Sequence, residues 1–477
     1  MTPIHSALFT DLYELTMIQG YRRFHENHDV VFDMFFRRPP FAGGFTVFAG
    51  LDDLIDRLER FRFTDEDIAY LKTVGLFEAD FLDYLREFRF SGKLFAMREG
   101  SIVFPGEPLI RVQAPLVEAQ LIEGMLLNTI NFQTLIATKS ARVYCASNGG
   151  LVLEFGLRRA QGQDGAMSAT RAAYIGGAAA TSNTLAGRVY GIPVKGTMAH
   201  SWVMAFGSEQ ESFDRYAELY PDSTILLIDT YSTMGSGIEC AIETGKRMKA
   251  QGHKIGVRLD SGDLEYLSKE VRRRLDEAGL DDATITASNE LNEEIIHQLV
   301  TSESPIDSWG VGTNMVTGGE DSSLTGVYKL AAKGDGNLQP TIKVSNQPAK
   351  TTNPGIKQVY RFRNGSNTPL ADLIALESEE IAEGRRYTFN HPDLSARRFE
   401  MAHYASIEPL LQPKMDSGRR VADRVPLSEL RDYCIASLEE FDHTYKRIIN
   451  PHIYKVSLSD SLAEMKRDLI NQYTQEI

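Results

Sequence analysis

The sequence is poor in cysteine and has no long apolar run, and each absence excludes a class of protein. Its three cysteines are far apart and odd in number, so they supply neither a disulfide framework nor a metal-binding pair. No apolar stretch reaches the roughly 18 residues that a transmembrane helix needs. Residues 1–16 contain Asp11 and Glu14 but no basic cluster, which argues against a secretory signal. We therefore expect a cytoplasmic protein.

Positive charge is also scarce. The chain has 51 Lys and Arg against 65 Asp and Glu, a formal net charge of −14. Such a protein repels polyanions, so we expect no broad binding to nucleic acid and none to anionic membranes. An anionic small molecule would need a local basic site. The balance of 42% hydrophobic and 24% charged residues is that of a globular protein, and 477 residues favour two or three domains.

The first part of the chain, to about residue 140, predicts mixed α and β structure. Residues 11–22 have apolar side chains near a helical period. Short apolar runs at 30–36 and 45–49, separated by Pro and Gly, predict a strand pair, and 93–112 holds two more strand-like runs. The segment 116–146 is rich in Leu, Ile and Ala without Pro, which predicts a long helical region.

From Leu151 the pattern changes to a series of short apolar runs separated by helix-like segments. The runs begin at residues 151, 192, 224, 254, 284 and 306. The segments 236–250 and 264–278 are followed by Gly252 and Gly279, as helix ends often are. Runs that are apolar throughout are typical of buried parallel strands. Repeated βα units predict either a doubly wound sheet or a βα barrel. Beyond residue 385 we find no chemical motif and expect helical packing.

Polar residues follow each of these predicted strands, at the end where both architectures place their chemistry. This strand-end set comprises Arg158, Arg159, Thr197, His200, Asp229, Thr230, Arg258, Asp260, Ser261, Asp263, Ser288, Asn289, Gly310, Gly312 and Thr313. Any one of them alone would be explained by an ordinary turn or ion pair. Six successive strand ends of this composition indicate an enzyme, although the sequence leaves open which of Arg158 and Arg159 faces the site.

The residue types in this set suit an anionic, sugar-bearing substrate. The run Gly310–Thr313 lets backbone N–H groups approach a phosphate, with a hydroxyl beside them. Arg258 and Asp260 are two apart on a strand and point to the same side. The arginine suits a carboxylate or phosphate, and the aspartate suits sugar hydroxyls, a metal or a ring nitrogen. His200 has hydroxyl and Gly neighbours, which favours a role as nucleophile or acid–base group.

Eight segments together carry a family resemblance. They are TDLYELTM (10–17), EFGLRRAQG (154–162), GTMAHS (196–201), IDTYST (228–233), RLDSGD (258–263), ITASN (285–289), GVGTNMVT (310–317) and NPGIKQVYR (353–361). Over nearly its whole length the chain resembles the nicotinate phosphoribosyltransferases.

The resemblance implies an α/β fold with an irregular βα barrel of the type II phosphoribosyltransferase kind. It implies a catalytic barrel over 141–339 and an N-terminal α/β domain over 1–140, completed by 340–477. It implies ATP-coupled formation of nicotinate mononucleotide and pyrophosphate from nicotinate and phosphoribosyl pyrophosphate, in NAD salvage. Mg²⁺ as cofactor, ATP as co-substrate and a homodimer with its active site completed across the interface also follow from it.

The resemblance also assigns roles by motif position. Tyr13, Thr197 and Arg258 match residues that hold nicotinate, and Phe155 matches the aromatic residue that stacks on the pyridine ring. His200 matches the histidine that ATP phosphorylates. Thr313 matches the ribose-phosphate site, and Asp260 matches a partner of the diphosphate and its Mg²⁺. The other expected substrate contacts are Arg158, Ser288, Gly310 and Gly312.

Other functions stay open. A nicotinamide phosphoribosyltransferase shares the architecture but carries an aspartate where this chain has Asn183. A neutral Asn183, with Arg158 and Arg258 nearby, tolerates a substrate carboxylate better than an aspartate would, because like charges repel. The further alternatives are quinolinate transfer, an inactive barrel that only binds phosphoribosyl ligands, and a barrel lyase or isomerase.

Overall fold

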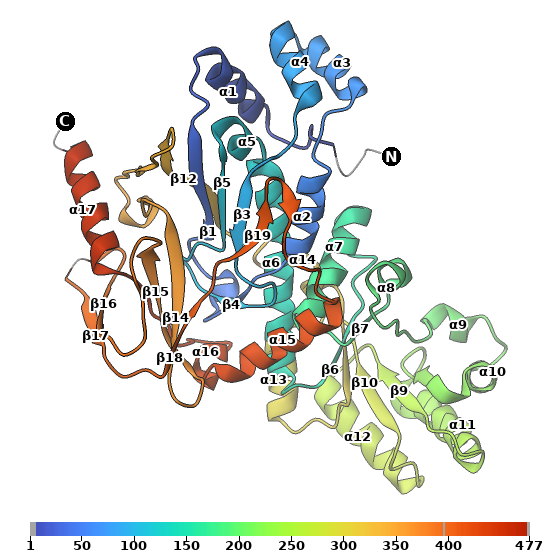
Figure 1. Ribbon diagram of the computed structural model, residues 1–477. Helices are drawn as coiled ribbons and strands as arrows, with labels where there is room; N and C mark the ends of the chain where they lie inside the picture. The colour runs from blue at the N-terminus through green and yellow to red at the C-terminus, as the bar shows by residue number, and fades with distance from the viewer. Residues whose placement is uncertain (1–5, 395, 475–477) are drawn as a thin grey trace. The chain divides into compact units, whose positions relative to one another are not determined.

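The computed structural model describes residues 6–394 and 396–474, which fall into two compact units (Figure 1). The parallel-sheet unit comprises residues 136–322. The two-segment unit combines the chain before residue 136 with the chain from residue 323 onward. The return to the two-segment unit precedes residue 340, because strand β12 (Gly326–Gly334) pairs with β1 (Asp29–Phe36).

The parallel-sheet unit contains one six-stranded sheet in the order β7-β6-β11-β10-β9-β8. Its strands are β6 (Leu151–Glu154), β7 (Ala180–Thr181), β8 (Ile225–Leu227), β9 (Gly256–Leu259), β10 (Thr284–Ala287) and β11 (Ser308–Val311). All five pairings between neighbours are parallel. Within the described ranges no pairing joins the edge strands β7 and β8, so the barrel is irregular. The predicted α/β class is confirmed.

Helices separate these strands, as the predicted βα units require. They are α7 (Gly162–Ile175), α8 (Thr184–Tyr190), α9 (His200–Met204), α10 (Glu209–Leu219), α11 (Ile238–Ala250), α12 (Leu264–Glu277), α13 (Glu293–Thr301) and α14 (Thr313–Thr317). Asp263 and Asn292 cap α12 and α13 by accepting backbone N–H bonds. Gly252 and Gly279 follow α11 and α12 with φ of +86° and +77°, which confirms both predicted helix ends.

One predicted strand of this unit is wrong. The run at 192 forms only an isolated bridge, between Val194 and Thr181, because Pro193 has no N–H to donate to a ladder. The strand of this repeat is instead β7, whose two residues are too few to show a period. Each of the other five predicted runs begins at most two residues before the first residue of an observed strand.

The two-segment unit contains two larger sheets and a short strand pair. Its seven-stranded sheet has the order β13-β12-β1-β5-β3-β19-β20, and its six-stranded sheet the order β17-β16-β21-β15-β14-β18. The strands not yet given are β2 (Thr46–Val47), β3 (Lys93–Ala96), β4 (Ile102–Val103), β5 (Ile110–Pro115), β13 (Gln339–Pro340), β14 (Lys357–Arg363), β15 (Pro369–Leu376), β16 (Tyr387–Asn390), β17 (Arg398–Met401), β18 (Ser406–Pro409), β19 (Gln412–Asp416), β20 (Arg419–Arg420) and β21 (Val456–Leu458).

The predicted pairing of 30–36 with 45–49 is wrong. β1 lies between β12 and β5, whereas β2 pairs with β4. The turn between the two runs explains the difference, because Phe41 and Ala42 adopt φ of 60° and 45° and redirect the chain. The predicted helix at 11–22 is confirmed as α1 (Leu12–Arg23).

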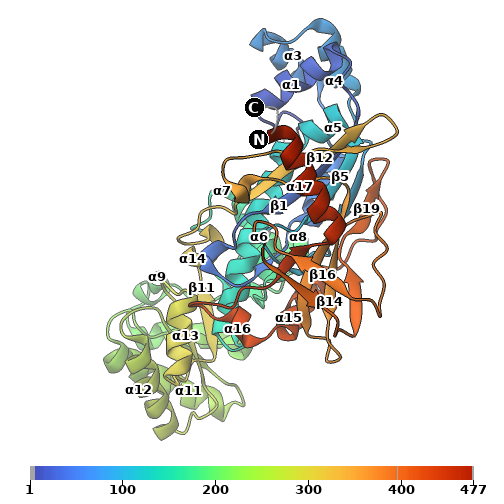
Figure 2. The ribbon, with the colours of Figure 1, turned by 90° about the vertical axis from the view of Figure 1, so that its left-hand side faces the viewer.

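The predicted long helix at 116–146 forms as two helices, α5 (Leu116–Leu121) and α6 (Glu123–Ala146). The remaining helices of the chain are α2 (Leu51–Glu59), α3 (Asp65–Val74), α4 (Ala79–Glu87), α15 (Leu427–Glu440), α16 (His443–Lys446) and α17 (Asp460–Thr474). The expectation of helical packing after 385 is wrong in part, since six short strands, β16 to β21, also lie there. Figure 2 shows α17 beside the six-stranded sheet of the two-segment unit, where it packs on β15. That sheet is mixed, since β15 and β21 are parallel while its other pairings are antiparallel. In the described part of the chain, no helix is long and apolar enough to span a membrane.

Candidate active site

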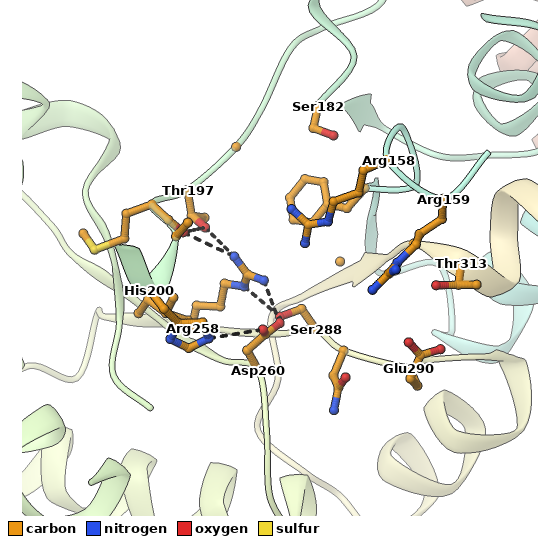
Figure 3. Close-up of a pocket in the computed structure, with 18 residues that line it drawn as sticks. Arg158, Arg159, Ser182, Thr197, His200, Arg258, Asp260, Ser288, Glu290 and Thr313 are labelled. Carbon is orange, nitrogen blue, oxygen red and sulfur yellow. Dashed lines mark hydrogen bonds and ion pairs between the residues drawn. The ribbon is translucent and has the colours of Figure 1, made fainter. Parts of the chain in front are cut away.

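The carboxyl ends of the parallel strands open into one polar pocket of about 300 Å³ (Figure 3). Its lining includes residues that follow β6, β7, β9, β10 and β11. The complete lining is Phe155, Arg158, Arg159, Ser182, Gly196, Thr197, Met198, Ala199, His200, Leu227, Arg258, Asp260, Ser288, Asn289, Glu290, Gly310, Gly312 and Thr313. Leu227, the last residue of β8, also belongs to the lining, so all six strand ends contribute to one concave surface, as parallel βα architectures allow.

The pocket brings together every residue of this unit to which the resemblance assigned a substrate or catalytic role. They are Phe155, Arg158, Thr197, His200, Arg258, Asp260, Ser288, Gly310, Gly312 and Thr313. Tyr13 is the exception, since it lies on α1 of the two-segment unit and lines a different cavity there. The roles assigned to these residues remain predictions. Asp229, Thr230, Ser261 and Asp263 of the strand-end set do not line the pocket at the strand ends.

Arg258 lies at the centre of the pocket's hydrogen-bond network. Its Nε donates to Ser288 Oγ at 2.7 Å, and its Nη1 donates to Thr197 Oγ1 at 2.9 Å and to the Met198 carbonyl at 3.4 Å. Its Nη2 donates to Asp260 Oδ1 at 2.6 Å. A guanidinium held in this way is fixed in orientation before any ligand arrives, which reduces the entropy cost of binding.

Asp260 is the acceptor that completes this network. It follows β9 and accepts from both Arg258 and the Ser288 hydroxyl. Burial acts to raise the pKa of Asp260, but the Ser288 hydroxyl and the Arg258 guanidinium outweigh it and hold the pKa below its ordinary value. The carboxylate therefore stays ionised throughout the physiological range.

His200 is the first residue of α9 and its side chain is 43% exposed. Its Nδ1 lies 3.2 Å from Thr230 Oγ1, and its Nε2 lies 3.6 Å from Asp260 Oδ2. The Thr230 hydroxyl orients the ring through one nitrogen. The other nitrogen faces the Asp260 carboxylate, so both ring nitrogens have a polar neighbour that holds the ring in place.

Glycine at position 310 lets an aromatic ring lie against the end of β11. A Cβ at Gly310 would come within 2.7 Å of Phe155 Cδ2, which is closer than side chains pack. Phe155 is itself anchored by its N–H to the Val311 carbonyl at 2.8 Å. Beside the ring, Gly312 and Thr313 bring backbone and hydroxyl groups to the pocket wall.

Both arginines that follow β6, Arg158 and Arg159, line the pocket. The sequence left open which of the two faces the site, and the structure shows that both do. The two lie on a turn, where Arg159 N–H donates to the Gly156 carbonyl at 2.8 Å. On an extended strand, neighbouring side chains would point to opposite faces. Figure 3 shows both guanidinium groups reaching into the pocket.

Sequence reasoning missed Ser182 and Glu290. Ser182 follows β7, the strand that no pattern reveals, and Glu290 follows Asn289, whose φ is +101°. Asn183, expected to meet the substrate, is absent from the lining. Its side chain caps α8 by accepting from Ala186 N–H at 3.2 Å.

A buried ion cluster supports the segment that carries Ser288, Asn289 and Glu290. Glu293, the first residue of α13, accepts from Lys139 Nζ at 3.0 Å and from Arg142 Nε at 2.8 Å. Burial opposes ionisation of Glu293, but these two cations lower the net pKa below its ordinary value. The start of α13 is thereby fixed to α6.

The donor set fits a metal ion that arrives with a phosphorylated substrate. Among residues 6–394 and 396–474 no cluster of three His, Cys, Asp or Glu side chains could hold a metal ion alone. Asp229 Oδ2 accepts from Ser261 Oγ at 2.5 Å, while its Oδ1 is buried without a hydrogen-bond partner. Mg²⁺ is usually held by one or two carboxylates together with substrate phosphates. Asp260, which lines the pocket, is a suitable carboxylate. Asp229 does not line the pocket but lies next to it, since its Oδ2 accepts from the Asp260 N–H at 3.3 Å.

Three family models match successive parts of the chain. The nicotinate phosphoribosyltransferase N-terminal domain matches residues 8–131, the nicotinate phosphoribosyltransferase family matches 151–366, and the corresponding C-terminal domain matches 356–466.

Similar proteins extend over the whole length. A nicotinate phosphoribosyltransferase of Bacillus subtilis (strain 168) is 44% identical over 476 residues, covering 99% of this chain and 96% of the relative. The human nicotinate phosphoribosyltransferase is 33% identical over 521 residues, covering 97% and 96%. The crystal structure of human nicotinic acid phosphoribosyltransferase superposes with a TM-score of 0.85 at 31% identity, covering 96% of this chain and 99% of that one. The chain belongs to the nicotinate phosphoribosyltransferase family.

Proposed function

We propose that this protein forms nicotinate mononucleotide and pyrophosphate from nicotinate and phosphoribosyl pyrophosphate, coupled to ATP hydrolysis, in the salvage of nicotinate for NAD synthesis. One observation carries the proposal in a member of this family. Arginines, a histidine, an ionised aspartate and glycine-rich backbone meet in one pocket at the strand ends. The pocket is large enough for one nucleotide-sized ligand.

The pyridine ring of nicotinate would lie against Phe155, with its carboxylate on the cationic side of the pocket. Arg258 is oriented by Thr197 and Ser288, so it can bind a carboxylate without losing side-chain freedom. Phe155 has its ring fixed over Gly310. Together these contacts would set the direction in which the ring nitrogen points.

The reaction needs positioning and charge neutralisation more than proton transfer. The ring nitrogen attacks the sugar C1 with its own lone pair, so no base is required. The C1–O bond to the diphosphate breaks, and its electron pair leaves with pyrophosphate. Arg158 and Arg159 would take up charge on the leaving group, and Gly312 and Thr313 would hold the ribose phosphate. Mg²⁺, when bound near Asp260, would neutralise further diphosphate charge.

ATP would act through His200. The imidazole is exposed and oriented by Thr230, which suits a nucleophile that attacks the γ-phosphorus of ATP. The bond from the γ-phosphorus to the bridging oxygen would break with its electron pair leaving on ADP, and water would later cleave the phosphohistidine and release phosphate. A phosphohistidine adds charge and acceptor oxygens at the pocket rim. We propose that this charge orders substrate contacts and favours product formation.

The acid substrate is favoured over the amide by the charge of the pocket. Arg158, Arg159 and Arg258 face Asp260 and Glu290, and Arg258 already neutralises Asp260. The three arginines outnumber the two carboxylates, so the pocket keeps a surplus of positive charge that suits a pyridine carboxylate better than an amide. The alternatives are nicotinamide or quinolinate transfer and an inactive phosphoribosyl-ligand-binding barrel.

The test is one assay on the purified protein with phosphoribosyl pyrophosphate and each of nicotinate, nicotinamide and quinolinate, with and without ATP. We expect nicotinate mononucleotide and pyrophosphate from nicotinate, at a rate that ATP raises. Faster turnover of either other pyridine would change the substrate. Binding of phosphoribosyl pyrophosphate without pyrophosphate release would indicate the inactive barrel.

A homodimer and a cytoplasmic location are part of the proposal and rest on the family resemblance. Tyr13, on the exposed face of α1, is the residue we propose to complete the active site of a second subunit.

A further inference from the structure

Glu154 is a buried carboxylate behind the pocket wall that forms no ion pair. It is the last residue of β6 and is 1% exposed. Its Oε1 accepts from the Gly156 N–H at 2.5 Å, and its Oε2 accepts from Thr170 Oγ1 at 2.9 Å and from Thr181 Oγ1 at 2.5 Å. In the part of the chain that the structure describes, no Lys, Arg or His lies within ion-pair distance of it.

Asn183 fixes the direction of these hydrogen bonds. Its backbone N–H donates to Thr181 Oγ1 at 2.9 Å, and its Nδ2 donates to Thr170 Oγ1 at 3.3 Å. The amide cannot be reversed without loss, because its Oδ1 accepts from the Ala186 N–H. Each threonine hydroxyl has one proton. Since both hydroxyls accept from Asn183, both protons are directed to Glu154.

Glu154 is therefore an acceptor of three hydrogen bonds. A protonated carboxyl group would present its own O–H to a site that offers only donors. Three donors aimed at its two oxygens suit a group that only accepts, as a carboxylate does. The network thus places one fixed negative charge inside the protein, although two of its donors are neutral hydroxyls and none of the three is cationic.

The backbone of Glu154 adjoins the pocket wall, although its side chain is not part of the lining. The next residue, Phe155, lines the pocket, and so does Ser182, whose N–H donates to the Glu154 carbonyl at 3.0 Å. The same wall carries Arg158 and Arg159, which suit anions. A negative charge beneath a cationic wall serves no anionic ligand. It suits a positive charge that develops on the ligand.

We propose that Glu154 is an electrostatic positioning residue that stabilises the positive charge formed during phosphoribosyl transfer. The inference rests on the proposed function. As the C1–O bond breaks, the sugar ring gains oxocarbenium character. As the nitrogen–C1 bond forms, the neutral pyridine nitrogen becomes a pyridinium cation. The electron pair leaves with pyrophosphate, and no proton moves. A fixed, desolvated carboxylate stabilises that cation without reorganising.

The experiment compares two inhibitors on three proteins. One inhibitor is the pyrrolidine analogue of ribose 5-phosphate, which is cationic at neutral pH. The other is its tetrahydrofuran counterpart, which has the same shape without the charge. Dissociation constants are measured for the unmodified protein, Glu154→Gln and Glu154→Asp, with pyrophosphate and Mg²⁺ present. Circular dichroism melting checks that each variant is folded.

We expect the unmodified protein to prefer the cationic analogue by roughly tenfold to a hundredfold. Glu154→Gln should lose most of that preference, because it removes the charge at nearly constant shape. Glu154→Asp should keep the preference even if both affinities fall. The ratio of the two affinities is independent of the fraction of protein that is folded, so a partly unfolded variant still gives a decisive result.

Equal preference in all three proteins would overturn the inference and leave Glu154 a structural residue. So would equal weakening of both analogues by Glu154→Gln. Failure of the proposed function is recognised separately, because the unmodified protein would then release no pyrophosphate from nicotinate and phosphoribosyl pyrophosphate.

Discussion

Arg258 and Asp260, two residues apart at the end of β9, form an ion pair with an N–O distance of 2.6 Å. Alternate residues of a strand share one face, so the short spacing brings the two charges together. Ser288, from the neighbouring strand end, bonds to both side chains. The pair is therefore a rigid unit with an orienting hydroxyl, and the first prediction follows from it.

Replacing Arg258 should impair nicotinate binding. Arg258→Ala removes the guanidinium and leaves Asp260 without its cation, and we expect the nicotinate KM to rise about tenfold to a hundredfold. Arg258→Lys should rescue little, because an ammonium group cannot make the same planar contacts. Steady-state kinetics at saturating phosphoribosyl pyrophosphate measures the effect. Arg273→Ala, at an exposed α12 position, is the matched control. An unchanged KM in Arg258→Ala would place nicotinate elsewhere.

Replacing His200 should separate transfer from ATP hydrolysis. His200→Ala should abolish stoichiometric ATP hydrolysis but leave slow, ATP-independent transfer, since phosphoribosyl pyrophosphate already carries a good leaving group. Product and ADP are measured in the same reaction. The control is His253→Ala, whose imidazole is paired with Asp222 near the protein surface. Stoichiometric ATP hydrolysis by His200→Ala would rule out its assignment as the phosphorylated residue.

A single methyl group at position 310 should displace the stacking ring. Gly310→Ala places its Cβ within 2.7 Å of the Phe155 ring, so Phe155 must move or the strand end must shift. We expect a raised nicotinate KM and a destabilisation of about 1–3 kcal/mol, the usual cost of overpacking. Gly165→Ala is the control, because a Cβ there meets nothing within 4 Å. Equal kinetics in the two variants would remove Phe155 from the ring site.

The stability of the protein should fall between weakly acidic and mildly alkaline pH. Burial, together with the nearby Glu123 carboxylate, raises the pKa of Glu14 from 4.5 to about 8. Between those two values the folded protein binds a proton that the unfolded chain has released, so the free energy of unfolding decreases as pH rises. Chemical denaturation at a series of pH values measures the slope. Glu14→Gln should flatten it, and an identical slope in that variant would show that Glu14 does not titrate in this range.

Mixing two defective variants tests the proposed shared site. If Tyr13 serves the pocket of a second subunit, a mixed dimer of Tyr13→Ala and Arg258→Ala contains one intact site. Random exchange of subunits should then restore about a quarter of the unmodified activity. The control takes each variant alone through the same subunit-exchange procedure, after which it should stay inactive. No recovery after demonstrated subunit exchange would mean that Tyr13 acts within its own subunit or not at all.

The elements that the sequence predicted well are those with local causes. Gly252 and Gly279 end their helices because glycine adopts positive φ readily, and the strand-end residues converge because parallel strands share a direction. What could not be predicted depends on distant segments. Thr197, Ser288 and Asp260 meet at Arg258 only in the folded chain, and β7 has two residues and no period.

The position of Asn183 shows the same limit. Motif position suggested a contact with the substrate, yet its amide instead orients Thr170 from another helix. Thr170 lies 13 residues before Asn183, and no spacing in the sequence reveals that the Thr170 hydroxyl donates to Glu154. Such networks depend on side-chain geometry, whereas the family motifs report only which residues occur.

The central claim is that one pocket at the strand ends holds both the pyridine and the phosphoribosyl group. The most direct measurement is a crystal structure of the protein with nicotinate mononucleotide, pyrophosphate and Mg²⁺. The account predicts the pyridine ring on Phe155, its carboxylate at Arg258 and the ribose phosphate at Gly312 and Thr313. A nucleotide bound away from these residues, with this pocket holding only solvent, would contradict it.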